Sequence, residues 1–123
     1  MLTGKYKPGQ PLPSGSRATD EKGGADTVKS FLTDDILERV QQLAPIAKAQ
    51  GLTLAQLAVA WVLANENVAG AIIGASRPEQ VESNVQASGV TLPAEVLSQI
   101  DDVIAPVAER DPRKTVSPPE RVV

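Results

Sequence analysis

Hydrophobic and polar positions divide the chain into a region rich in glycine and proline and a region with clear periodicity. Residues 1–30 show no apolar period, which is typical of a long functional loop or an unstructured segment. From residue 31 to about residue 105, apolar residues recur at spacings that predict helices and one strand. Residues 106–123 again lack a period, and we expect them to form an exposed tail.

Two helices are predicted on either side of Gly51, which supplies a C-terminal stop for the first. Thr33 caps this first helix, and acidic residues in its first turn complement the helix dipole. Its apolar stripe consists of Ile36, Val40, Leu43 and Ala47. Because proline removes one helical hydrogen bond, Pro45 predicts a kink or a break near 41–42.

Thr53 and Gln56 form a capping-box pattern, which starts a second helix running to about Asn65. Over 54–64 every residue except Gln56 is apolar, and the stretch includes the only tryptophan, Trp61. A helix that is hydrophobic all round is expected to be buried on most sides. This one is too short to cross a membrane.

The stretch 68–84 predicts a strand, a glycine turn and a capped helix. Residues 69–73 are a short apolar run with β-branched members, typical of a buried strand, and Gly74 ends the run. The next helix, over 78–87, is predicted from three signals at its start: Ser76 and Glu79 as a capping box, and Pro78 in the first turn. A last helix begins near Pro93.

The start of the helix at 78 is a candidate anion site. Helix N-termini present unpaired amides and the positive end of a dipole, which suits a phosphate. Arg77 adds a bidentate donor, and Gln80 and Asn84 continue the polar side. Lys5 and Arg17 either close over such a phosphate or are simply solvated. A purely structural turn has the same local pattern, and the single glycine matches neither a dinucleotide fingerprint nor a P-loop.

Composition excludes several kinds of site. The 123 residues are 41% hydrophobic but only 2% aromatic, so aliphatic side chains and alanine must fill the core of a single domain. The chain has no cysteine and no histidine, which excludes disulfides, thiolate metal sites and histidine-based catalysis. The net charge of −3 argues against nonspecific binding to nucleic acid or an anionic membrane. With no signal peptide or membrane-length apolar run, a cytoplasmic location is expected.

The inventory of elements is unbalanced, with several helices and one strand. A lone buried strand has no neighbour here to pair with, and each unpaired buried backbone group would cost about 1–3 kcal/mol. We therefore expect something outside these residues to complete the structure.

Four motifs together resemble one family. They are Leu2-Thr3-Gly4-Lys5-Tyr6, Gly15-Ser16-Arg17, the run from Thr53-Leu54-Ala55-Gln56 to Trp61-Val62-Leu63, and Ile72-Ile73-Gly74-Ala75-Ser76 followed by Gln80 and Asn84. Their order and spacing are similar to the C-terminal third of an aldo-keto reductase, of the bacterial and potassium-channel-β-subunit-like branch. The resemblance extends from residue 2 to about residue 105.

The resemblance implies an α/β fold, the C-terminal portion of a (β/α)₈ barrel that is mostly helical as an isolated chain. Residues 1–6 would follow strand seven, and 69–73 would be strand eight. The partial barrel would comprise a cofactor-side loop (1–30), helices with one strand (31–105) and a tail (106–123). The family's cofactor is NADPH, lying at the C-terminal mouth of the barrel.

The resemblance also implies roles for seven residues in cofactor binding. Gly74, Ser76 and Arg77 would hold the 2′-phosphate. Gln80 and Asn84 would contact the adenine end. Lys5 and Arg17 would fold over the pyrophosphate and ribose.

No catalytic residue is implied. The family's catalytic tyrosine, lysine, aspartate and histidine come from the first half of the barrel, and Tyr6, the only tyrosine, lies in a loop motif. Hydride transfer needs an acid beside the carbonyl, so the chain alone is expected to be inactive. It would be a fragment that associates with the missing barrel part or with itself.

A noncatalytic nucleotide-binding or assembly module is the alternative function. A helix-turn-helix around 47–63 is a remote one, because its second helix offers only Gln56 to base edges.

Overall fold

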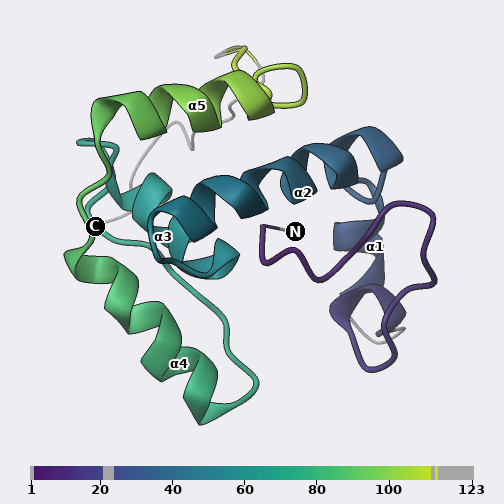
Figure 1. Ribbon diagram of the computed structural model, residues 1–123. Helices are drawn as coiled ribbons and strands as arrows, with labels where there is room; N and C mark the ends of the chain where they lie inside the picture. Colours follow the sequence, from purple (N-terminus) through teal and green to yellow (C-terminus); the bar gives the residue numbers. More distant parts are fainter. Residues whose placement is uncertain (1, 21–23, 112, 114–123) are drawn as a thin grey trace.

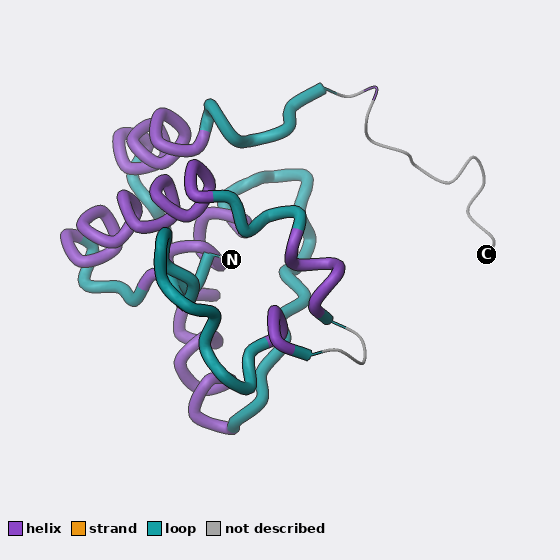
Figure 2. Tube along the Cα trace, turned by 90° about the vertical axis from the view of Figure 1, so that its right-hand side faces the viewer, coloured by secondary structure: helices purple, strands orange, loops and turns teal. Residues whose placement is uncertain are grey.

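The computed structural model describes residues 2–20, 24–111 and 113, and its regular elements are helices (Figure 1). Their order is η1 (Arg17–Thr19), α1 (Ala25–Lys29), α2 (Asp34–Ala49), α3 (Leu54–Leu63), α4 (Pro78–Val85), η2 (Gln86–Gly89) and α5 (Ala94–Ile104). No strand occurs in this part of the chain, so loops alone join the helices (Figure 2).

The boundaries of α2 and α3 follow the capping signals. The Thr33 hydroxyl accepts a hydrogen bond from the Ile36 amide at 3.4 Å. After α2, Gly51 adopts a φ of +68°, a conformation that glycine reaches without strain. At the start of α3, the predicted capping box is complete: the Gln56 backbone amide donates to the Thr53 hydroxyl at 3.2 Å, and the Thr53 backbone amide donates to Gln56 Oε1 at 2.9 Å.

Pro45 lies inside α2 without breaking it, so the predicted break near 41–42 is wrong. The proline is exposed, and water can therefore hydrogen-bond the carbonyl that has lost its amide partner. Leu43 and Ala47, only 4% and 2% exposed, pack into the core on the other side of the helix. Their burial favours an uninterrupted helix.

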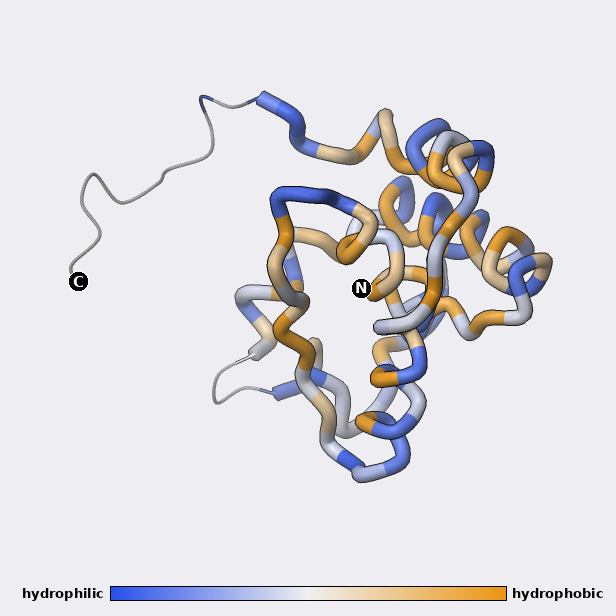
Figure 3. The backbone as a smooth tube through the Cα atoms, turned by 90° about the vertical axis from the view of Figure 1, so that its left-hand side faces the viewer, coloured by the Kyte–Doolittle hydropathy of each residue, from blue (hydrophilic) through white to orange (hydrophobic). Residues whose placement is uncertain are grey.

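Aliphatic side chains and alanine form the main core, as the composition predicted. It lies between α2, α3, η2 and α5, and its buried members are Leu43, Ala47, Leu57, Ala60, Ala87, Leu92, Val96 and Ile100. α5 lies alongside α2 (Figure 1), and hydrophobic positions alternate with hydrophilic ones along the helices (Figure 3). α5 starts directly after Pro93, as expected.

α3 is buried on one face only. Leu57 and Ala60 are each 1% exposed, but Trp61 and the other apolar residues of the helix are half-buried. The expectation of burial on most sides is therefore wrong for this chain. Part of the apolar surface of α3 remains accessible within the described structure.

The N-terminal region contains more regular structure than its composition predicts. It includes η1 and α1, and a second small core forms where Tyr6 and Ala18 pack against Leu37 of α2. The Tyr6 hydroxyl accepts a hydrogen bond from the Ala18 amide at 3.3 Å. These contacts join residues distant in sequence, so periodicity could not reveal them.

The strand expected over 69–73 is absent, which corrects the strongest local prediction. This segment is a loop, and the side chains of Ile72 and Ile73 are 104% and 41% exposed. A strand needs a neighbour that pairs with its amides and carbonyls. The described residues provide none, so the segment leaves α3 as an unpaired connection to α4.

Part of the predicted tail, residues 112 and 114–123, lies outside the described residues. Two residues of the predicted tail that the structure describes are Asp111 and Arg113. They form an ion pair at 2.8 Å, and the Arg113 guanidinium lowers the pKa of the Asp111 carboxyl. Within the described part of the chain, no single helix has the length and apolar character needed to cross a membrane. α2 and α3 meet those criteria only as a pair, and the pair is bent by 89°.

Candidate functional site

The turn before α4 differs from its predicted form by one residue. Arg77 is the N-cap, with φ −145° and ψ 146°, and Pro78 follows in the first turn as expected. The residue before a proline is driven out of the helical region, so Arg77 cannot be the first helical residue and Ser76 cannot cap the helix. The predicted capping box of Ser76 and Glu79 is therefore wrong.

The Gln80 side chain stabilises this turn in place of the predicted capping box. Its side-chain oxygen accepts hydrogen bonds from the Ser76 amide at 2.8 Å and from the Ser76 hydroxyl at 3.2 Å. Ser76 is thus fixed beside the first turn of α4, although it is exposed. These two bonds occupy the Gln80 oxygen. Gln80 therefore stabilises the turn and also lines the site.

Five of the seven predicted binding residues line one open hollow of about 660 Å³, which we call the loop hollow. Lys5 and Arg17 come from the N-terminal region, and they face Gly74, Ser76 and Gln80 from the turn before α4. Residues far apart in the sequence thus converge here.

The other two residues, Arg77 and Asn84, line a neighbouring hollow of about 750 Å³, which we call the α4 hollow. Thr3, Gly74 and Gln80 line both hollows, so the two are adjacent. Thr53 and Ala55 at the start of α3 complete one side of the α4 hollow. All seven predicted residues therefore lie around one pair of adjoining hollows.

The charge around these hollows favours an anion. Lys5, Arg17 and Arg77 are exposed, and in the described part of the chain none of them is paired with a carboxylate. Glu79 is the acidic residue among those lining the α4 hollow. Lys5 Nζ lies 5.9 Å from the centroid of the Tyr6 ring, a contact that leaves its charge in place. Three cations without a carboxylate partner among the described residues create a local positive potential, although the whole chain carries a net charge of −3.

Ser16 belongs to the Gly15-Ser16-Arg17 motif, but the sequence analysis assigned it no role in binding. It is 2% exposed, and its hydroxyl has no hydrogen-bond partner among the described residues. Its neighbours Gly15 and Arg17 line the loop hollow. A serine next to the predicted Arg17 was the available signal, but nothing in the local pattern distinguished it from a loop serine.

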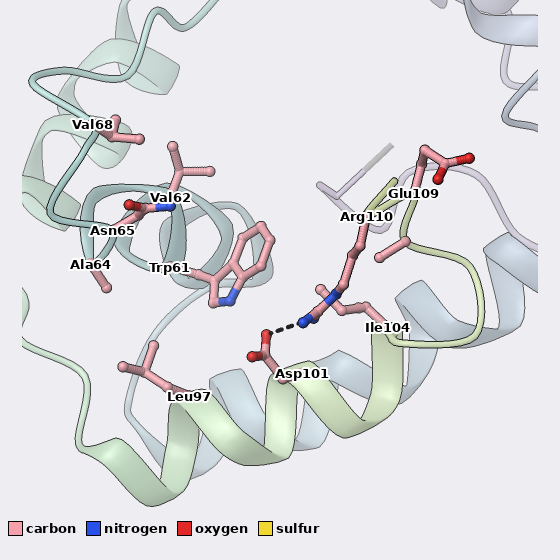
Figure 4. A pocket seen from close by; sticks show the side chains of 11 residues that line it. Trp61, Val62, Ala64, Asn65, Val68, Leu97, Asp101, Ile104, Glu109 and Arg110 are labelled. Atoms are coloured by element: carbon pink, nitrogen blue, oxygen red, sulfur yellow. Dashed lines mark ion pairs between the residues drawn. The ribbon is translucent and has the colours of Figure 1, made fainter. Parts of the chain in front are cut away.

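A separate hollow of about 610 Å³ lies between α3 and α5 and contains none of the predicted residues (Figure 4). The Trp61 side chain projects from α3 into this space, opposite Leu97 and Asp101 of α5 (Figure 4). Asp101 pairs with Arg110 at 3.4 Å, and both side chains are substantially exposed. This Trp61 hollow is mainly apolar, and its one cation among the lining residues is already paired.

Two other kinds of site lack support. Across the described ranges, no group of three or more histidine, cysteine, aspartate or glutamate residues is placed to hold a metal ion. The helix-turn-helix hypothesis needs Gln56 at a base edge, but Gln56 is 7% exposed and donates its amide hydrogens to Ser83 and Gln86. It is therefore unavailable to DNA.

Comparison with known proteins extends over most of the chain. A family model described as "Aldo/keto reductase family" matches residues 1–105. A probable voltage-gated potassium channel subunit beta from Arabidopsis thaliana is 43% identical over 106 residues, covering 85% of this chain and 32% of the relative. An L-glyceraldehyde 3-phosphate reductase from Escherichia coli O157:H7 is 41% identical over 106 residues, with 85% and 30% covered.

A third relative is similar over the same share of the chain. A putative voltage-gated potassium channel subunit beta from Schizosaccharomyces pombe is 39% identical over 107 residues, covering 85% of this chain and 30% of the relative. The chain thus spans about a third of the length of the relatives it matches.

Proposed function

The chain belongs to the aldo/keto reductase family of oxidoreductases, and we propose that it supplies the part of such an enzyme that holds the 2′-phosphate and adenine end of NADP(H). The observation that carries this proposal is the convergence of Lys5, Arg17 and Arg77 with two side-chain amides around the adjoining hollows.

The chemistry of the lining residues fits a phosphorylated nucleotide. Gly74, Ser76 and Arg77 are assigned to the 2′-phosphate, because a guanidinium, a hydroxyl and a helix start are all donors to phosphate oxygens. Lys5 and Arg17 are assigned to the pyrophosphate, whose negative charge suits these two cations of the loop hollow, and to the uncharged ribose beside it.

Gln80 and Asn84 are assigned to the adenine end. Both lie on α4, and both line the α4 hollow. The Gln80 oxygen is occupied by Ser76, so this side chain offers its nitrogen as a donor to a ring nitrogen of the base, whereas the Asn84 amide can both donate and accept.

The fold that goes with this function is the C-terminal portion of a (β/α)₈ barrel. In that arrangement, 69–73 pairs as a strand with neighbours that the described residues do not contain, and the exposed Ile72 becomes covered. The carboxyl end of this strand leads to Gly74 and the turn before α4. Ligands of such barrels bind at the carboxyl ends of the strands, which is where the adjoining hollows lie relative to 69–73.

NADPH supplies the hydride for carbonyl reduction when it is bound. This chain's own residues bind and orient its adenosine end, and no residue here is assigned to protonate the carbonyl oxygen. The catalytic residues are therefore contributed by another part of the complete barrel. The alternative, a noncatalytic nucleotide-binding module, is favoured by the similarity to relatives named as potassium channel subunits.

Fluorescence titration of the 123-residue chain with NADPH and with NADH tests the proposal. We expect NADPH to bind more tightly, and Arg77→Ala to weaken NADPH by roughly tenfold or more, the value of a hydrogen bond to a charged group, while NADH changes little. Arg110→Ala is the matched control, since it removes an exposed cation from the Trp61 hollow. Absence of binding for both nucleotides would refute the proposal.

A second measurement tests whether the chain contributes to chemistry. We expect no carbonyl-dependent oxidation of NADPH by the purified chain alone. Turnover above the background rate would show that it carries catalytic residues after all. A chain that binds NADPH but gives no turnover when the remaining part of a barrel is supplied supports the noncatalytic module.

A further inference from the structure

We propose that two glutamines, Gln41 of α2 and Gln56 of α3, are positioning residues that hold opposite walls of the adjoining hollows. Gln41 fixes the loop that carries Lys5, and Gln56 fixes the helix that carries Gln80 and Asn84. This inference rests on the proposed function, because it names the residues that set the geometry and cofactor preference of the same site.

Gln41 holds the N-terminal wall. Its side-chain nitrogen donates to the Tyr6 carbonyl at 3.1 Å and to the Gly4 carbonyl at 3.4 Å. These carbonyls flank Lys5 on either side. Because both bonds come from one side chain on α2, Gln41 is a directional restraint on this loop.

Gln56 holds the opposite wall. Its side-chain oxygen completes the capping box with the Thr53 amide at 2.9 Å. Its nitrogen donates to the Ser83 carbonyl at 2.8 Å and to Gln86 Oε1 at 3.2 Å. Carbonyls in the last turn of a helix lack amide partners within the helix, so Gln56 ties the start of α3 to the end of α4.

α4 depends strongly on this tie. None of its residues, Pro78–Val85, is buried, so the helix has little packing of its own to fix its position. Its C-terminal end is anchored by the fully buried Ala87 of η2 and by the Gln56 hydrogen bonds. Loss of these bonds would let the first turn of α4, where Arg77 lies, move relative to α3.

The two glutamines therefore affect different parts of a bound nucleotide. The Lys5 wall faces the pyrophosphate and ribose, which NADPH and NADH share. The α4 wall holds Arg77, which faces the 2′-phosphate that only NADPH carries, and also Gln80 and Asn84, which face the adenine that both nucleotides carry. Disturbing Gln41 should weaken both nucleotides by the same factor, whereas disturbing Gln56 should weaken NADPH more than NADH.

Methionine substitutions test this difference because they keep chain length while removing the amide. We expect Gln56→Met to weaken NADPH by roughly tenfold, the effect of leaving one buried polar group without its partner, and NADH by a smaller factor, because NADH loses only the adenine contacts of α4. Gln41→Met should weaken both nucleotides by a similar factor. Gln42→Met on α2 and Gln99→Met on α5 replace exposed glutamines and serve as matched controls.

Hydrogen exchange gives a readout that is independent of nucleotide. In Gln56→Met we expect faster amide exchange over 78–85. Gln41 holds carbonyls and not amides, so for Gln41→Met the readout is limited proteolysis: we expect trypsin to cleave faster after Lys5, with exchange over 78–85 unchanged. Gln56→Glu keeps the oxygen that caps α3 but loses the donor to Ser83, so it should show the Gln56→Met pattern in a chain whose α3 is still capped.

Each outcome has a distinct meaning. If the natural chain binds neither nucleotide, the proposed function fails, and the exchange and proteolysis patterns alone decide whether the glutamines position the walls. If it binds NADPH but Gln56→Met weakens both nucleotides equally, or leaves exchange over 78–85 unchanged, the positioning role is refuted. A loss of overall stability in Gln56→Met that leaves the ratio of NADPH to NADH affinity constant would also overturn the role of Gln56.

Discussion

The side chain of Arg17, which lines the loop hollow, lies close to the backbone of Gly24. A Cβ atom placed on Gly24 would lie 2.3 Å from Arg17 Cγ and 3.1 Å from the Arg17 carbonyl oxygen. The φ of Gly24 is −118°, which any residue can adopt, so space and not backbone conformation requires glycine here. Gly24, at the start of α1, thereby leaves room for the side chain that lines the site.

Gly24→Ala should therefore displace Arg17 and weaken nucleotide binding. We expect NADPH affinity to fall by roughly tenfold if the arginine loses its contact with the ligand. Titration of this variant beside Gly89→Ala checks the prediction, since a Cβ at Gly89 meets open space. An unchanged affinity in Gly24→Ala would mean that Arg17 makes no contact that matters for binding.

At the scale of elements, local signals predicted the helices well and the strand poorly. Thr33, Thr53 and Pro93 marked helix starts correctly because a cap depends on only a few neighbouring residues. The apolar run at 69–73 has the composition of a strand, but a strand exists only with a pairing partner. The cap predicted at Ser76 was wrong for a local reason. Pro78 drives Arg77 out of the helical region, and this constraint is stronger than the capping-box pattern.

The two threonine caps provide a quantitative comparison. Thr53→Ala removes a cap that is part of a reciprocal pair with Gln56, so we expect it to lower the free energy of unfolding by about 1 kcal/mol. Thr33→Ala should cost less, since its hydrogen bond to the Ile36 amide is long at 3.4 Å. Urea unfolding followed by circular dichroism measures both, with Thr91→Ala, an exposed threonine, as control. An equal or larger loss in Thr33→Ala would contradict this order.

For the whole molecule, the candidate site could be predicted only through the resemblance. The local pattern around Arg77 favoured a structural turn over a phosphate site, and it favoured Lys5 and Arg17 as solvated cations. Their convergence on Gly74 and Gln80 depends on how α2 and α3 pack, which no periodicity within one segment encodes. The order of the four motifs carried this information because a related fold had already placed them together.

The exposed apolar surface leads to a prediction about association. Ile72 is 104% exposed, Val81 and Val85 on α4 are 47% and 58% exposed, and one face of α3 is only half-buried. Unpaired backbone at 69–73 is also available to a neighbouring chain, as at the edge of a sheet. Apolar surface of this kind favours contact with another copy or with the rest of a barrel.

We therefore expect the purified 123-residue chain to form dimers or larger species, and Ile72→Lys to shift it toward monomer, because a charge at this position opposes both apolar contact and strand pairing. Light scattering over a range of concentrations measures the change. Gln99→Lys adds the same charge at an exposed position of α5 and should leave the association unchanged. A natural chain that is monomeric at every concentration and unfolds cooperatively would contradict the prediction, because its exposed segment would then be stable without any partner.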